Sequence, residues 1–178
     1  VVMQLGQAAG AVAAISCKEN RNVDRVGVRK VQSALLDAGC YIMPYLDLPK
    51  DHRHFKALQK IGATGILRGE GRNVGWANQT WFRADDPLLA EEIYPEGYYN
   101  GVLPFDEGPV KVGQFIEVVR RLGVPVPGNA SSWWEDAGLS DYDAGRIITR
   151  LEAAVVIDKA IDPFRMFGVD WFGNVMLY

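Results

Sequence analysis

Apolar residues recur at intervals of three and four in several separate stretches of the chain, which is the spacing of one face of an α-helix. In residues 24–39 this pattern ends at Gly39, a residue that favours the end of a helix. The same spacing predicts helices over residues 51–62, 110–123 and 147–161. The predicted fold class is therefore mostly α.

Two of the predicted helices begin with capping signals. Thr149 followed by Glu152 has the spacing of a capping box, and Pro163 is placed to stop that helix. Asp86 followed by Pro87 is typical of a cap and a first turn, which predicts a helix up to residue 93. A further short helix is expected to begin near residue 133.

The order of turn, cap and amphipathic helix occurs three times, starting near Asp86, Pro109 and Ile148. Such recurrence indicates repeated helix–turn–helix units. The two prolines of residues 40–49 predict an extended linker before these units. We therefore expect one piece over residues 1–43 and a main domain over residues 50–178, with a strand near the chain's end.

The opening helix, predicted over residues 6–19, is rich in glycine and alanine, so a neighbouring body can approach its backbone closely. Two interpretations remain open. One is a tight helix–helix contact, and the other is the approach of an anion or a polar ring edge to backbone N–H groups. A chain that opens inside such a run, without an initiator Met, is expected to be the tail of a larger protein.

Composition narrows the range of partners. The net charge of −3, with no basic block, argues against nucleic acid and against an anionic membrane surface. No apolar run approaches the roughly 20 residues that a membrane-spanning helix needs, and no signal peptide is recognised. Cys17 and Cys40 are interpreted as small core residues rather than a disulfide or a nucleophile.

Few residues suggest catalysis. His52 and His54 have the spacing of a metal-binding pair, but they lack an evident third ligand. Gly65, Gly69 and Gly71 resemble a phosphate-binding loop only loosely, and turn glycines explain them better. Adjacent acidic residues are explained by capping and surface charge. We predict no catalytic residue and no metal site in this chain.

Aromatic residues gather between positions 76 and 99, among amide side chains. Flat rings beside amides are typical of a sugar-binding platform, although core filling explains the same residues. Trp76 and Trp81 are the candidate ligand-binding aromatics.

Four stretches carry a first resemblance. They are similar to the C-terminal portion of bacterial FAD-dependent oxidoreductases, and they are residues 5–14 (LGQAAGAVAA), 28–36, 55–69 and 148–164. These belong to the flavoproteins with two dinucleotide-binding folds, and some carry the label xanthan lyase. The resemblance covers nearly the whole chain.

This resemblance implies a role beside a flavin. Gly6, Gln7 and Ala8 would be the cofactor-binding residues, close to the flavin ring in the parent protein. The glycine-rich loop that holds the FAD pyrophosphate is absent here, so the chain alone is not expected to retain FAD. The resemblance also implies a periplasmic or extracellular location and a missing N-terminal flavin domain as partner.

A second resemblance is to S-layer homology modules. It rests on residues 65–69 (GILRG), 80–88 and 148–152 (ITRLE). It implies helix–turn–helix units and cell-wall-polymer binding. The cap explains Thr149 and Glu152, which leaves Arg150 as a candidate ligand-binding residue.

Three roles follow as expectations. The first is an accessory region of an FAD-dependent oxidoreductase, inactive by itself. The second is a stand-alone module that binds carbohydrate or cell-wall polysaccharide, and the third is a purely structural helical cap.

Overall fold

The computed structural model describes residues 2–101, 103–122 and 128–176. It divides the chain into two compact units, Met43–Met166 and a second unit that joins Val1–Ile42 to Phe167–Tyr178. Residues 167–176 therefore group with the opening helices, whereas the sequence placed them in a 50–178 domain. We describe each unit by itself.

The smaller unit contains helices and a short hairpin. Its elements are α1 (Val2–Glu19), the 3₁₀ turn η1 (Val23–Arg25), α2 (Val28–Asp37), β3 (Gly168–Val169) and β4 (Val175–Met176). Helix α2 packs on α1 and on β3, and it buries Val31 and Leu36. The indole Nε1 of Trp171 donates to the carbonyl of Asp24 at 3.1 Å, which ties the hairpin to η1.

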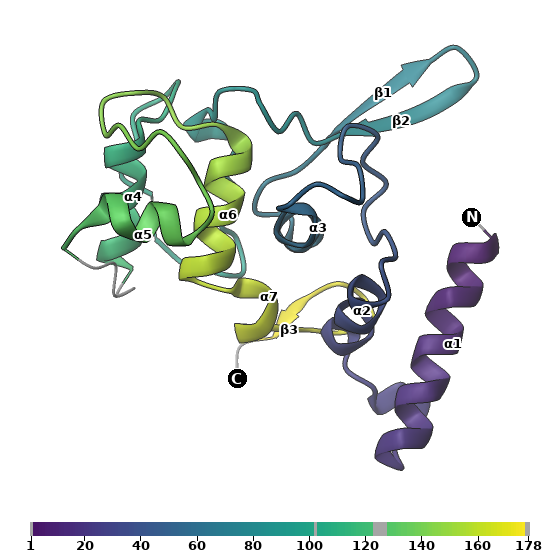
Figure 1. Cartoon of the computed structure of the whole chain (residues 1–178). Coiled ribbons are helices and arrows are strands. Elements are labelled where there is room, and N and C mark those ends of the chain that lie inside the picture. Colours follow the sequence, from purple (N-terminus) through teal and green to yellow (C-terminus); the bar gives the residue numbers. More distant parts are fainter. Residues whose placement is uncertain (1, 102, 123–127, 177–178) are drawn as a thin grey trace. The chain divides into compact units, whose positions relative to one another are not determined.

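The larger unit is built mainly from helices (Figure 1). Its elements are α3 (Phe55–Thr64), β1 (Glu70–Val74), β2 (Ala77–Trp81), the 3₁₀ turn η2 (Ala90–Glu92), α4 (Val112–Arg121), α5 (Ala130–Asp136), α6 (Arg150–Ala160) and α7 (Pro163–Met166). Helix α6 packs against α3, α4 and α7, and its residues from Ala153 to Ile157 are all buried.

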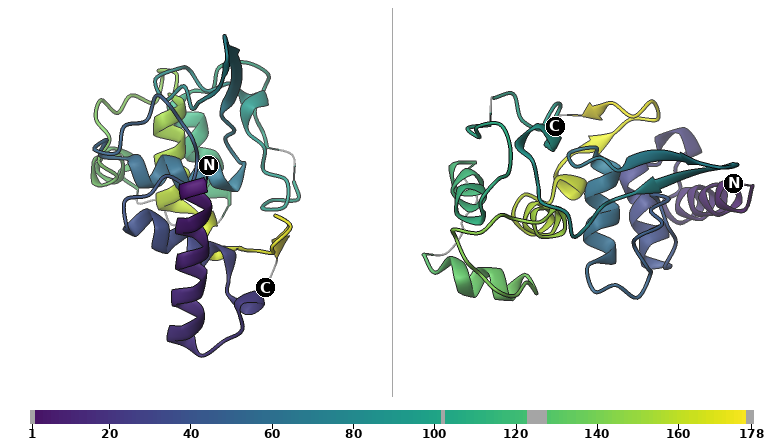
Figure 2. Two further views of the ribbon diagram at one scale, coloured as in Figure 1. Left: turned by 90° about the vertical axis from the view of Figure 1, so that its right-hand side faces the viewer. Right: turned by 90° about the horizontal axis from the view of Figure 1, so that it is seen from above.

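The β1–β2 hairpin projects from the body of this unit, as Figure 2 shows from two sides. The strands pair antiparallel from Glu70 with Trp81 to Val74 with Ala77, which leaves a loop of two residues. Gly75 begins that loop at φ 58°, a conformation that glycine adopts without steric cost.

The prediction of a helix-rich fold is confirmed. The described residues also form small sheets, of which the sequence predicted only a strand near the chain's end. The structure contains α2, α4, α5 and α6 close to their expected positions, and Gly39 follows α2 at φ 72°. Helix α3 begins at Phe55 rather than at Asp51 and ends at Gly65 in the left-handed conformation. The expected end of α4 at residue 123 lies outside the described residues.

The predicted helix that starts at Asp86 is wrong. Residues 87–89 are extended, because Pro87 and Leu89 form β-bridges with Thr149 and Pro109, and only the short turn η2 follows. The backbone groups that would form hydrogen bonds within a helix here form them with other segments of the chain. Cys17 is a second correction: it is exposed on α1, since no described residue of that helix is buried.

Candidate functional site

The three repeated segments meet in a closed ring of backbone hydrogen bonds. The N–H of Leu88 donates to the carbonyl of Ile148 at 2.9 Å, and the N–H of Ile148 donates to that of Val110 at 2.9 Å. The N–H of Val110 completes the ring to Leu88 at 3.0 Å. The side chains of all three residues are at most 1% exposed. The copies that begin near residues 86, 109 and 148 therefore occupy equivalent places around one buried centre.

A second ring lies two residues further along each segment. The N–H of Ala90 donates to Gly108, that of Val112 to Arg146 and that of Arg150 to Asp86. In each copy, the side chain three positions after the cap residue accepts a hydrogen bond from the backbone N–H of that cap residue. The accepting side chains are Glu92, Gln114 and Glu152. The three helix starts thus share one hydrogen-bonding scheme.

Arg150 distinguishes the third copy from the other two, which have alanine and valine at the equivalent position. Its side chain is almost completely buried and its three nitrogens all have partners. Nε donates to the carbonyl of Phe82 at 2.9 Å and Nη2 to that of Arg68 at 2.6 Å. Nη1 forms an ion pair with Glu92 at 3.0 Å. Arg150 therefore has a structural explanation independent of any ligand.

Arg150 also forms part of the wall of a charged cleft of about 180 Å³ in the larger unit. The lining contains three arginines, two glutamates and one tyrosine. These residues, with one glycine, are Arg68, Gly69, Glu70, Arg83, Glu92, Tyr94 and Arg150. Because arginines outnumber carboxylates, the cleft has an excess of positive charge in a chain whose net charge is negative.

Arg83 is held in this cleft by its backbone and its side chain. Its φ of 60° is unusual for a residue with a side chain, and the carboxylate of Asp47 stabilises it by accepting the N–H groups of Phe82 and Arg83 at 2.8 and 2.6 Å. Its guanidinium forms ion pairs with Asp86 at 2.6 Å and with Glu70 at 3.3 Å. The charge of Arg83 is thus already compensated.

Two neighbouring groups respond to these charges. A hydrogen bond from Arg72, together with the nearby charges of Arg72 and Arg83, lowers the pKa of the Glu70 carboxyl. The hydrogen bond that Arg83 donates to Asp86 raises the pKa of Arg83. Both effects keep the rim of the cleft ionised at neutral pH.

Arg68 differs from the other two arginines of the cleft in its contacts. Its guanidinium carbon lies 4.0 Å from the centre of the Tyr94 ring, and its Nε donates to the carbonyl of Gly65 at 3.3 Å. Within the described parts of the chain, no carboxylate forms an ion pair with it. A cation stacked on an aromatic ring at a small cleft is suited to bind an anionic group.

The predicted aromatic platform is not assembled. Trp76 lies at the tip of the β1–β2 hairpin and is fully exposed, whereas Phe82 is part of the core. Trp81 lies at the hairpin's base, where its Nε1 donates to Gln79 at 3.2 Å. Five residues of strand separate the two tryptophans by about 17 Å. Trp76 and Trp81 therefore do not form one platform.

The candidate flavin-proximal residues lie within helix α1. The helix begins at Val2, four residues earlier than expected, so the backbone N–H groups of Gly6, Gln7 and Ala8 fall inside it rather than among its first donors. Gly6 and Gln7 are exposed and Ala8 is half-buried. A Cβ added to Gly6 would meet no atom within 4 Å. The position of Gly6 therefore offers open space, but none of the three residues offers a free N–H donor.

The other motifs have structural explanations. Nε2 of His54 lies 3.2 Å from the carbonyl of Gly138, and burial lowers its pKa. The described residues contain no group of three side chains suited to a metal ion. Gly65 follows helix α3 in the left-handed conformation, which accounts for that glycine. A Cβ on Gly69 would meet the ring of Tyr45, so close packing accounts for Gly69.

Sequence reasoning missed most of the cleft. Arg68 and Glu70 belong to one segment, Glu92 to a second and Arg150 to a third. The bridge between Leu67 and Ile93 and the contacts of Arg150 with Arg68 and Glu92 bring these segments together. The available signal was the repeat itself, since equivalent helix starts predict that residues near them are neighbours.

Comparisons with protein-family models, curated proteins and solved structures find no match for this chain. Among the residues described, no helix is long and apolar enough to cross a membrane.

Proposed function

We propose that this chain is a C-terminal accessory region of an FAD-dependent oxidoreductase and has no catalytic activity by itself. The observation that carries the proposal is helix α1. Residues 2–17 include no charged side chain, yet none of the described residues of this helix is buried. A long apolar helix with an open face requires a partner to cover it.

The small residues of α1 support a close contact. The half-buried positions lie on one face; they are Ala8, Ala11, Val12, Ile15, Ser16 and Glu19. The stripe of Met3, Gly6, Gly10, Ala13 and Cys17 is exposed at helical spacing. Because Gly6 and Gly10 have no neighbouring atom within 4 Å of an added Cβ, a flat surface fits against this stripe.

In this proposal the flavin domain binds FAD, and Gly6, Gln7 and Ala8 lie nearest to the flavin ring. The oxidoreductase chemistry belongs to that domain and its cofactor. The resemblance that supports this assignment also supports a periplasmic or extracellular location.

The test uses the complete reading frame that contains this chain. We expect the purified protein to show the visible absorption of bound flavin. Gly6→Leu should lower the flavin content, whereas Gly27→Leu, at an equally open glycine beyond α1, should not. In the chain expressed alone, neither variant should reduce the unfolding temperature. A well-folded complete protein without flavin would refute the proposal.

A second candidate function is the binding of an acidic polysaccharide by the larger unit. We propose that residues 43–166 are an S-layer-homology-like unit, which the ring of three equivalent segments supports. The specific observation in favour of a ligand is Arg68, stacked on Tyr94 and without an ion pair among the described residues. A carboxylate on a sugar would supply the missing anion.

Retardation of the chain in gels that contain acidic or neutral polysaccharides tests this function. We expect retardation by an acidic glycan only, and its loss in Arg68→Ala. Arg121→Ala, which removes an exposed arginine of α4, is the matched control. The variants Trp76→Ala and Trp81→Ala test whether the β1–β2 hairpin also contributes to the retardation. Equal migration of the unaltered chain in all gels would exclude this function.

A further inference from the structure

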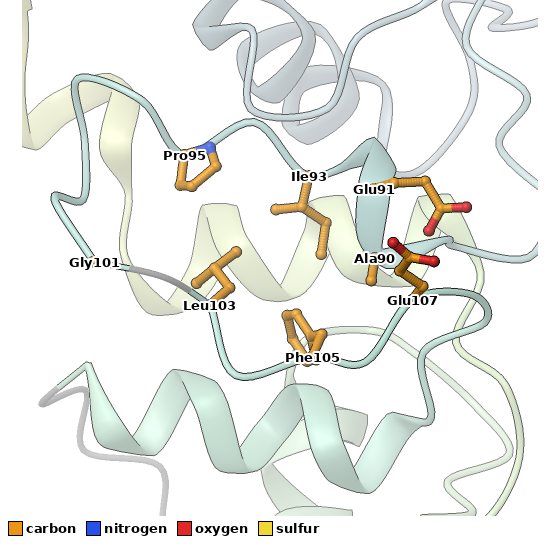
Figure 3. Close-up of a pocket in the computed structure, with 8 residues that line it drawn as sticks. All are labelled: Ala90, Glu91, Ile93, Pro95, Gly101, Leu103, Phe105 and Glu107. Atoms are coloured by element: carbon orange, nitrogen blue, oxygen red, sulfur yellow. The ribbon is translucent and has the colours of Figure 1, made fainter.

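A second cavity, of about 310 Å³, lies in the larger unit apart from the arginine cleft (Figure 3). It is formed by turn η2 and the loop that follows it. The residues that line it are Ala90, Glu91, Ile93, Pro95, Gly101, Leu103, Phe105 and Glu107. Neither the flavoprotein proposal nor the polysaccharide proposal uses any of them.

The floor of this cavity is apolar and fixed. Figure 3 shows the side chains of Ile93, Leu103 and Phe105 directed toward a common space. The ring of Phe105 stacks on the buried ring of Phe115, with centroids 6.1 Å apart and an interplanar angle of 7°. Ile93 is held by a β-bridge with Leu67. The three residues are only half-buried, so an apolar group that enters the cavity gains contact with a preformed surface.

The rim of the cavity is acidic. Residues 90–109 contain five carboxylates and no lysine, arginine or histidine. Of these acids, Glu92 is paired with Arg150. Glu91 and Glu107 are exposed at one side of the cavity, and in the described part of the chain neither forms an ion pair. Glu91 accepts the N–H of Gly108 at 3.1 Å, which brings its carboxylate next to Glu107 along the rim.

We propose that this cavity binds an organic cation: an ammonium or guanidinium group on an apolar stem. The stem lies against Ile93, Leu103 and Phe105, and the charged end lies between Glu91 and Glu107. An anion is repelled by this rim. A neutral apolar ligand contacts the apolar floor but leaves the two carboxylates without a counter-charge. It therefore binds more weakly than the cation.

Amide chemical shifts in NMR spectra of the whole chain test the site with three probes of one stem length: hexylammonium, hexanol and hexanoate. We expect hexylammonium to shift the amide signals of Ile93, Leu103 and Gly108 in a saturable manner. Hexanol should bind more weakly, and hexanoate should leave these signals unchanged. Equal effects of the three probes, or no effect of hexylammonium, would overturn the proposal.

Variants locate the charge. Glu91→Gln combined with Glu107→Gln should weaken hexylammonium binding by about tenfold or more, because two charged partners are lost while the acceptor for Gly108 is retained. Glu96→Gln, at an exposed glutamate of the same loop outside the cavity lining, is the matched control and should bind as before. Unaltered binding in the double variant would refute the site.

A lysine blocked at both backbone ends distinguishes two sources of the cation. Tighter binding of the blocked lysine than of hexylammonium assigns the site to a side chain of a polypeptide. Tighter binding of hexylammonium assigns it to a free amine. Failure of both probes to compete with each other would contradict a single cation site.

Discussion

The guanidinium of Arg150 and the carboxylate of Glu92 form an ion pair of 3.0 Å, with the arginine side chain almost wholly buried. The pair joins the first helical position of α6 to the last residue of turn η2. Since Arg150 also donates to the carbonyls of Phe82 and Arg68, one side chain connects three segments of the larger unit. We interpret Arg150 first as a structural residue.

Replacing Arg150 by methionine should therefore destabilise the chain. It leaves Glu92 without its partner and two carbonyls without a donor, and we expect the free energy of unfolding to fall by about 3 kcal/mol. The control Arg165→Met removes an exposed pair with Asp162 and should change it by no more than about 0.5 kcal/mol. Urea unfolding measures both. Equal effects of the two substitutions would contradict a structural role for Arg150.

Glu152 makes stability depend on pH. Burial alone would raise the pKa of its carboxyl, but the hydrogen bonds from Arg146 and Thr149 outweigh burial and lower the pKa. Its folded pKa is thus below the unfolded value, so its contribution is present above pH 4.5 and is lost as the pH falls through the folded pKa. Glu152→Gln should cost about 1 kcal/mol at neutral pH, a cost that disappears in acid.

Urea unfolding at a series of pH values checks this prediction. The difference between the unaltered chain and Glu152→Gln should shrink as the pH is lowered below 4.5. Glu117→Gln, at an exposed i,i+4 pair with Arg121, is the control and should show little difference at any pH. A cost of Glu152→Gln that stays constant into acid would show that its charge is not involved.

Tyr45 and Gly62 form a tight contact in the core of the larger unit. A Cβ on Gly62 would collide with the phenol of Tyr45, so Gly62→Ala should cost about 1–3 kcal/mol through overpacking. Gly71→Ala, at a glycine with open space around it, is the control and should be nearly neutral. Thermal unfolding of both variants measures the difference. Equal unfolding temperatures would refute the contact.

The hydroxyl of Tyr45 is buried without a hydrogen-bond partner among the described residues, and burial raises its pKa to about 12. Tyr45→Phe removes this unsatisfied group. We expect the variant to be as stable as the unaltered chain or more stable by about 1 kcal/mol, as urea unfolding will show. A clear loss of stability would mean that the hydroxyl has a partner in solution.

The sequence predicted those elements whose signals are local. Thr149 and Glu152 form the capping box that their spacing indicates. Gly39 follows α2 as expected. Capping and periodicity depend on a few neighbouring residues, so a single sequence carries them.

Features that depend on distant segments were not predictable in the same way. Asp86 and Pro87 have the signals of a helix start, but bridges to Thr149 and Pro109 use the same backbone. The apolar spacing of helix α3 gives no sign that Gln59 is buried. Its side chain is nevertheless fully buried and forms two hydrogen bonds with the backbone of Met43. The hairpin was detectable from Gly75 at a two-residue turn.

The flavoprotein proposal requires that the exposed stripe of α1 is covered in the complete protein. Cys17 lies on that stripe and is exposed in this chain, while Cys40 is half-buried. The measurement is the rate at which a maleimide reagent labels Cys17, in the chain alone and in the complete protein. We predict fast labelling in the chain alone and strong protection in the complete protein; equally fast labelling in both would contradict the claim.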